Sequence, residues 1–107
     1  MHDEKIRTDM TDHLMEAVLS LENKEEAYDF FEDLCTIAEL KSMSQRLEVA
    51  KMLRHGRTYQ EIGKATGAST ATISRVNRAL VWGEDGYLKV LEKLGSKPTQ
   101  QSTEDEV

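Results

Sequence analysis

One stretch limits the possible folds more than any other part of the sequence: residues 58–76, which read TYQEIGKATGASTATISRV. Apolar residues fall at helical spacing on both sides of Gly67, and small hydroxyl residues crowd the second half. A glycine at such a place favours a tight turn, because it adopts a positive φ at little cost. The stretch therefore predicts two short helices that pack at a steep angle, in a helix-turn-helix.

Every position that this motif requires is filled. The first helix needs an inner apolar residue and a small residue where the second helix crosses it, and the second helix needs an inner apolar face. The residues predicted for these structural roles are Ile62, Gly63, Gly67, Ala68, Ile73 and Val76. Ser69 is suited to cap the N-terminus of the second helix.

The remainder of the chain predicts an all-α fold. The chain has 107 residues, which fits one domain, and it is rich in helix formers but lacks the alternating pattern of strands. Apolar periodicity and capping residues predict helices over residues 4–21, 24–34, 37–55, 59–66, 70–82 and 85–94. The third helix is expected to turn Leu40, Met43, Leu47, Ala50 and Leu53 inward.

Short-range signals predict some of the helix ends. Asn23 with Glu26, and Thr36 with Glu39, have the spacing of a capping box, in which side chain and backbone satisfy each other at a helix start. Gly56 suits the position just after the third helix, where a left-handed conformation often ends a helix.

We expect three regions along the chain. Residues 1–35 form dimerisation helices, residues 36–95 form the helix-turn-helix region of the same domain, and residues 96–107 form a disordered acidic tail. The N-terminal helices carry an apolar stripe and the adjacent Phe30 and Phe31. They either fold onto the domain's own core or build a homodimer interface. We favour the homodimer, because a dimer enlarges a core that is small in a chain of this length.

The charge distribution points to the same stretch. The net charge of −6 by itself argues against a nucleic-acid partner. However, residues 41–80 hold 8 basic and 2 acidic side chains, net +6, whereas residues 1–40 have a net charge of −9 and residues 81–107 of −3. The helix-turn-helix therefore lies in the one basic segment, which a phosphate backbone attracts at short range.

The outward face of the second helix suits base edges. Small side chains let a helix N-terminus approach the groove, hydroxyls bond either kind of base, and alanine contacts the thymine methyl group. The residues predicted to contact DNA are Gln60, Lys64, Ser69, Thr70, Ala71, Thr72, Ser74, Arg75 and Arg78, with Arg57 and Arg54 beside them. Of these, Lys64, Arg57 and Arg54 are assigned to phosphates, from charge and location.

Other chemistry finds little support in the sequence. Cys35 is the only cysteine, which fits a reducing compartment, and there is no signal peptide and no apolar run long enough to span a membrane. His2, His13 and His55 are scattered without the spacing of a zinc site. No carboxylate pair, nucleophile or phosphate loop is set up for catalysis. We therefore expect a cytoplasmic protein without a metal, and not an enzyme.

The same residues carry a family resemblance. The run MLRHGRTYQEIGKATGASTATISRVNRAL resembles the DNA-binding half of the tryptophan repressor family, most clearly in GRTYQEI, TGAS and ATISR. TIAELKSMSQRLEVAKML is similar to the family's long central helix, and the chain looks most like the YerC/YecD branch over about residues 30–95. The resemblance implies an intertwined homodimer whose two heads bind double-stranded DNA about 34 Å apart. It matches Gln60, Thr70, Ala71 and Ser74 to DNA-facing positions, and Arg78 to a DNA-proximal one.

The resemblance also implies a corepressor pocket, although only in part. Arg46 and Arg75 match the two arginines that sandwich the ligand's indole ring, and Thr36 matches a threonine near the pocket mouth. Val76 replaces a glycine that lines the pocket, and Ala79 replaces a serine that holds the ligand's amino group. We therefore expect a small-molecule corepressor other than tryptophan, or none.

Two hypotheses from different classes remain. The first is a sequence-specific, dimeric transcriptional regulator that acts as a repressor. The alternative is a protein-interaction module that uses the helix-turn-helix fold without specific DNA binding. They differ in what the outer face of residues 70–82 contacts.

Overall fold

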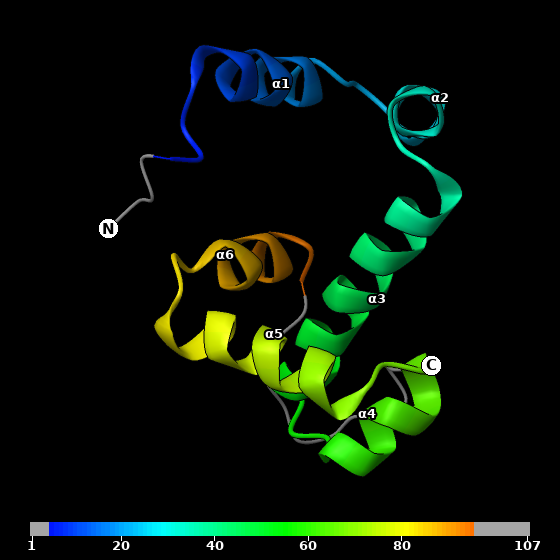
Figure 1. Ribbon diagram of the computed structural model, residues 1–107, viewed down its shortest axis with the longest axis vertical. Helices are drawn as coiled ribbons and strands as arrows, with labels where there is room; N and C mark the ends of the chain where they lie inside the picture. Colours follow the sequence, from blue (N-terminus) through cyan, green and yellow to red (C-terminus); the bar gives the residue numbers. More distant parts are fainter. Residues whose placement is uncertain (1–4, 96–107) are drawn as a thin grey trace. The chain divides into compact units, whose positions relative to one another are not determined.

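The computed structural model describes residues 5–95 and is built of helices (Figure 1). They are α1 (Asp9–Leu19), α2 (Lys24–Leu34), α3 (Ile37–Arg54), α4 (Tyr59–Thr66), α5 (Thr70–Trp82) and α6 (Gly86–Lys93). No residue of the described range lies in a strand. The all-α prediction with six helices is confirmed, and the expected acidic tail lies outside the described residues.

The first helix is shorter than its apolar spacing predicted. It begins at Asp9 rather than at residue 4, and it ends at Leu19 rather than at residue 21. Thr8 sets the start, because its Oγ1 accepts from the Thr11 backbone N–H at 3.1 Å while Thr11 Oγ1 accepts from the Thr8 N–H at 2.8 Å. Ile6, which the predicted stripe included, therefore precedes the helix.

One of the two predicted capping boxes is complete. At the start of α3, Glu39 N–H donates to Thr36 Oγ1 at 3.0 Å and Thr36 N–H donates to Glu39 Oε1 at 2.8 Å. At the start of α2, Glu26 N–H donates to Asn23 Oδ1 at 2.9 Å. There the Glu26 side chain reaches one residue beyond the cap, and its Oε1 accepts from the Glu22 N–H at 3.0 Å.

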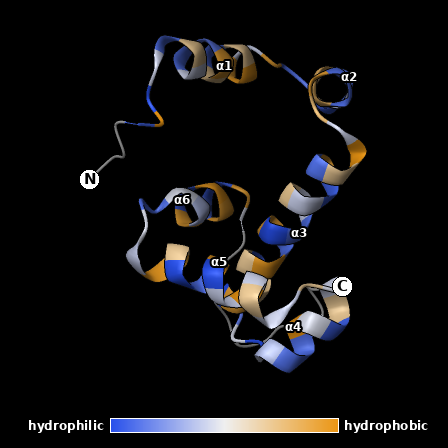
Figure 2. Cartoon of the chain, viewed as in Figure 1, coloured by the Kyte–Doolittle hydropathy of each residue, from blue (hydrophilic) through white to orange (hydrophobic). Residues whose placement is uncertain are grey.

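The chain divides into two compact units, one up to Lys41 and one from Ser42 onward. Between residues 5 and 41 no side chain is buried. Phe30 and Phe31 meet edge to face, with ring centroids 5.4 Å apart, and both remain half-buried. The large apolar side chains exposed in this unit are Ile6, Met10, Met15, Leu19, Tyr28, Leu34 and Ile37 (compare the hydropathy colours in Figure 2). This part of the chain does not bury a core of its own.

The second unit contains the core. Its buried residues come from α3, α4, α5, α6 and the turn between α4 and α5, and they are Val49, Ala50, Ile62, Ala68, Ile73, Val76 and Leu91. The inward face predicted for α3 was partly wrong. Val49 is fully buried, whereas Met43 and Leu47 are each 39% exposed. Ala50 is buried and Leu53 packs against the core, as predicted. The side of α3 that carries Val49 and Ala50 faces the core, so the earlier part of the predicted stripe lies on a neighbouring face.

Two side-chain contacts fasten α3 to the elements that follow it. Gln45 Nε2 donates to the carbonyl oxygen of Thr66, in the last turn of α4, at 3.1 Å. Arg54 Nη2 bonds Glu92 Oε1 of α6 at 2.8 Å, and the Arg54 side chain is only 12% exposed. The first bond satisfies a carbonyl group in the last turn of α4 and links α4 to α3. The second is an ion pair between two side chains and links α6 to α3.

The turns depend on glycine at two places. Gly56 has φ +78° after α3, as predicted, and its N–H donates to the carbonyl oxygen of Leu53 at 3.0 Å. Gly67 also has φ +78°, and its N–H closes α4 on the carbonyl oxygen of Gly63 at 2.8 Å. At Gly63 an added Cβ would lie 3.5 Å from the Ala68 carbonyl oxygen, an ordinary contact, so this crossing needs a small residue but not glycine.

The same substitution at two glycines should therefore have opposite effects on stability. Gly67→Ala is expected to lower the free energy of unfolding by about 1–2 kcal/mol, because alanine is strained at a positive φ. Gly86→Ala, in α6 where an added Cβ meets no atom within 4 Å, is expected to raise it by up to about 1 kcal/mol. Urea unfolding of both variants measures this. Equal changes of the same sign would contradict the assignment.

Candidate nucleic-acid interface

The turn between α4 and α5 is held by its own side chains. Thr66 Oγ1 donates to the Ile62 carbonyl oxygen at 2.8 Å and accepts from the Ala68 N–H at 3.1 Å. Ser69 caps α5 as predicted, since its Oγ accepts from the Thr72 N–H at 3.1 Å. Ala68 is 8% exposed and packs into the core beneath the turn. The bonds that fix the crossing of the two helices all lie between Ile62 and Thr72.

The interior side of α5 determines which side faces outward. Ile73 and Val76, three residues apart, are each 1% exposed and pack in the same core as Ile62, which is fully buried. The helix-turn-helix residues predicted from sequence are thus brought together in the second unit. With these side chains inside, the opposite side of α5 faces solvent.

The exposed side of α5 carries the predicted contact residues. Thr70 and Ala71 in its first turn are exposed, as are Arg75 and Arg78 further along, while Ser74 is half-buried. No long side chain stands among the residues of the first turn. The start of α5 can therefore approach a surface closely, with two guanidinium groups following behind.

Two of the predicted contact residues also have local roles. Ser69 Oγ lies 3.1 Å from Thr72 Oγ1 and bonds the Thr72 N–H, and Thr72 is half-buried. Their hydroxyls therefore shape the start of α5 first. Each oxygen keeps further bonding capacity, but both are less free to contact DNA than Thr70.

In α4, Gln60 and Lys64 are exposed one helical turn apart and so lie on one side of the helix. The start of α4 is fixed by a capping box that the sequence reading missed. Thr58 N–H donates to Glu61 Oε1 at 2.9 Å, and Glu61 N–H donates to Thr58 Oγ1 at 3.1 Å. The T-x-x-E spacing at residues 58–61 could have revealed it.

The two arginines before α4 differ in their surroundings. Arg57 is half-buried, and it makes no ion pair within the part of the chain that the structure describes. The guanidinium of Arg54 is instead held by Glu92, and its buried Nε has no hydrogen-bond partner among the described residues. Arg54 is thus a link between helices, which argues against the phosphate contact predicted for it.

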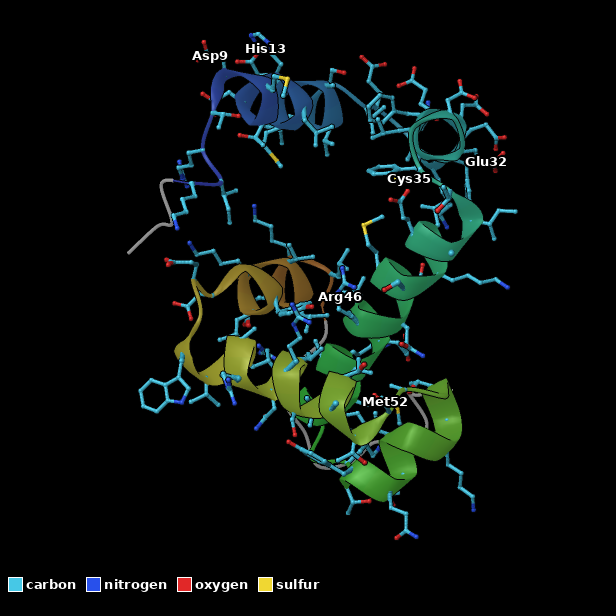
Figure 3. All side chains as sticks on the ribbon, in the orientation of Figure 1. Asp9, His13, Glu32, Cys35, Arg46 and Met52 are labelled. Atoms are coloured by element: carbon cyan, nitrogen blue, oxygen red, sulfur yellow. The ribbon has the colours of Figure 1, made fainter. Side chains whose placement is uncertain are left out.

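The three polar residues matched to a corepressor pocket, Thr36, Arg46 and Arg75, have different surroundings in the structure. Arg46 is half-buried on α3 (labelled in Figure 3), and its Nη1 donates to Ser42 Oγ at 2.8 Å. Arg75 is exposed on α5. Thr36 belongs to the first unit, where its hydroxyl caps α3. Val76 lies in the core, so that position is occupied by protein.

Residues 5–95 offer no support for a metal site or a membrane span. No group of three or more histidine, cysteine or acidic side chains in this range could hold a metal ion. His13 and Cys35, for example, lie on α1 and directly after α2 without further ligands grouped around them (Figure 3). Within the same range, no helix combines the length and apolar character needed to cross a membrane.

Comparison with known proteins agrees with this geometry. The chain is 50% identical over 103 residues to YerC of Bacillus subtilis (strain 168), an uncharacterized protein, covering 96% of this chain and 99% of YerC. The crystal structure of a TrpR-like protein from Eubacterium eligens ATCC 27750 is 58% identical, with a TM-score of 0.87, over 91% of this chain and 100% of that one. A candidate Trp repressor from Staphylococcus aureus is 52% identical, with a TM-score of 0.88, over 92% and 99%.

The family model of the Trp repressor protein matches residues 9–95, which include all six helices. The match spans the helix-turn-helix as well as the exposed apolar helices before it. The sequence, the arrangement of α4 and α5 and the similar solved structures agree: the chain belongs to the Trp repressor family, in the branch that contains YerC.

Proposed function

We propose that this protein is a homodimeric, sequence-specific regulator of transcription that reads double-stranded DNA with α5 and acts as a repressor. The observation that carries the proposal is the division of α5 into two sides. Ile73 and Val76 are buried, while Thr70, Ala71 and Arg75 on the other side are exposed. This is the arrangement that a recognition helix needs to enter a major groove.

The composition of the exposed side favours DNA over a protein partner. Protein interfaces rely on apolar and aromatic anchors, and the first two turns of α5 present none on their exposed side. The exposed Trp82 and Val81 lie at the C-terminal end of the helix, away from the turn that would enter the groove. Hydroxyls, a small methyl group and arginines are instead what base edges and phosphates bind. The Trp repressor family is a family of DNA-binding regulators, which supports the same assignment and a cytoplasmic, non-enzymatic role.

The homodimer part of the proposal rests on the first unit. Unpartnered apolar side chains such as Met10, Leu19 and Ile37 are 74–83% exposed. A soluble monomer seldom leaves so many large apolar side chains in contact with water, and a second copy of the same segment offers matching apolar surface.

For the ligand, we propose a corepressor other than tryptophan, or none. Val76 is 1% exposed among the core side chains and fills the position where the family's pocket has a glycine. Ala79, half-buried on α5, offers no hydroxyl to a ligand's amino group. The guanidinium groups of Arg46 and Arg75 could bind either a ligand or DNA phosphates.

The test of the proposal is selection of bound duplexes from a random double-stranded pool at about 0.15 M salt. Recovery of a two-fold symmetric site with half-sites about one helical turn apart is the expected result. Repeating the selection with and without amino acids tests for a corepressor, and a reporter gene placed behind the recovered site tests repression. Recovery of random sequence alone would favour the protein-interaction alternative.

Removal of two hydroxyls should separate specific from nonspecific binding. Thr70→Ala and Ser74→Ala are each expected to weaken binding to the selected site by about 1–3 kcal/mol, because each good base contact contributes about that much discrimination. Binding to unrelated DNA should stay within about twofold, since no charge changes. Electrophoretic mobility shifts on the two duplexes measure this. Equal losses on both would count against base reading by α5.

The salt dependence of binding should identify the phosphate contacts. Lys64→Met and Arg57→Met are each expected to reduce the slope of log K against log salt by about one, because each removes one neutralised phosphate. Lys93→Met, an equal change of charge at an exposed site of α6, serves as the control. Arg54→Met should lower the unfolding free energy while leaving the slope unchanged, because its guanidinium is held by Glu92.

The oligomeric state can be tested at an exposed residue. Ile37→Asp, at a side chain 74% exposed in the single chain, is expected to weaken dimerisation at least tenfold, because it buries a charge in an apolar interface. The helix itself tolerates aspartate in its first turn. Asn23→Asp adds the same charge in the same unit and keeps its cap, so it is the matched control. Sedimentation equilibrium that shows a wild-type monomer would overturn the dimer.

A further inference from the structure

A cavity lies beside the turn from α3 to α4, and of its lining residues the proposed function uses only Arg57. Its volume is about 330 Å³, within the range of small-molecule sites. All of its lining residues belong to the second unit. They are Glu48, Lys51, Met52, His55, Arg57, Glu61 and Ala65.

The lining carries charges of both signs. Lys51, His55 and Arg57 are half-buried, while the two carboxylates, Glu48 and Glu61, are exposed. The two cationic residues are therefore less exposed than the two acidic ones. Neither Lys51 nor Arg57 makes an ion pair within the described residues 5–95. An anion placed between them would gain charge-assisted hydrogen bonds that no protein group supplies.

The walls of the cavity are fixed by the backbone. Gly56 has φ +78°, and the Arg57 N–H donates to the Met52 carbonyl oxygen at 3.1 Å, so the turn that carries Arg57 is closed on α3. On the facing side, Glu61 is held by its capping box with Thr58. Because these elements are already ordered, a ligand would not need to order them.

The lining also includes two apolar side chains. Met52 (labelled in Figure 3) packs against the core of the second unit, and Ala65 lines the cavity from α4. A cavity lined by two cations, two carboxylates and apolar groups suits a small organic molecule better than a bare ion. The anionic group would lie at Lys51 and Arg57, and a neutral or positively charged part would lie near Glu48.

We propose that this cavity is a binding site for an oxyanion, a carboxylate or a phosphate, held by Lys51 and Arg57. It is separate from the corepressor pocket implied by the family, since neither Arg46 nor Arg75 lines it. Two sources share this chemistry: a free metabolite and a phosphate of bound DNA. The two carboxylates in its lining favour the metabolite, because they repel a polyanion.

Occupancy of this site has a direct consequence for the helix-turn-helix. The lining residues come from α3, from the turn and from α4, so an anion bound between them bridges the long helix and the first helix of the motif. If the proposed function holds, such a bridge changes the affinity for DNA, because it favours one position of α4 relative to α3. The binding itself does not depend on that function.

The first experiment titrates inorganic phosphate into the ¹⁵N-labelled full chain at constant ionic strength, with sodium chloride as the balancing salt. The expected result is a saturable shift of the amide signals of residues 51–61 with a Kd on the order of millimolar. A linear drift without saturation, or shifts spread evenly over the chain, would overturn the site. Because this readout needs only the wild-type protein, it decides the question even where a variant folds poorly.

Variants then locate the anion. Lys51→Met combined with Arg57→Met is expected to weaken phosphate binding at least about tenfold, since two charge-assisted bonds are lost. Lys89→Met, on α6 and outside the lining, is the control for charge and should leave the phosphate Kd unchanged. A double variant that binds phosphate like the wild type would refute the proposal.

The last step identifies the source of the anion. The phosphate titration is repeated on the complex with a duplex recovered by selection. If a DNA phosphate fills the cavity, the duplex displaces inorganic phosphate and the apparent Kd rises in proportion to DNA occupancy. If a metabolite fills it, phosphate still binds to the complex. Failure to bind any specific DNA would refute the proposed function and leave the result of the first titration standing.

Discussion

The burial of Ile62 against the side of α5 that carries Ile73 and Val76 is the contact on which the rest of the second unit depends. α4 has only 8 residues, and an isolated helix of that length is not stable in water. Its structure therefore comes from its packing and from the bonds at its two ends. Once these three side chains are inside, the side of α5 that remains for a partner is determined, and so are the residues on it.

The parts of the structure that follow from short-range chemistry could be predicted from the sequence. Ser69 as a cap and Gly67 as a left-handed turn residue act within a few positions of the chain, so their local pattern is sufficient. The start of α1 was not predicted, because apolar spacing continues through Ile6. The Thr8–Thr11 pair that sets the start of α1 has threonine in place of the glutamate that usually completes a capping box.

Contacts between distant residues could not be predicted in this way. Gln45 bonds Thr66, 21 residues away, and Arg54 bonds Glu92, 38 residues away. Periodicity assigns a residue to a face of its own helix, but the neighbour that covers that face is set by the fold. Arg54 was therefore read as one more cation of a basic segment. Its packing, rather than its charge, decides what it can bind.

The exposed sides of α4 and α5 carry few charges. This explains why, in the proposed function, DNA binding depends on dimerisation. Per chain, only a few cations, such as Lys64, Arg75 and Arg78, are exposed on α4 and α5, so few phosphates are neutralised and the nonspecific affinity of one head is low. A second head in the same complex makes its own binding intramolecular and raises the affinity without any new contact. The apolar side chains that the first unit leaves exposed offer the surface for such a pairing. Because each helix-turn-helix carries little charge, the affinity of the dimer rises chiefly at DNA sites where both copies contact their preferred bases. Dimerisation therefore favours specific over nonspecific binding.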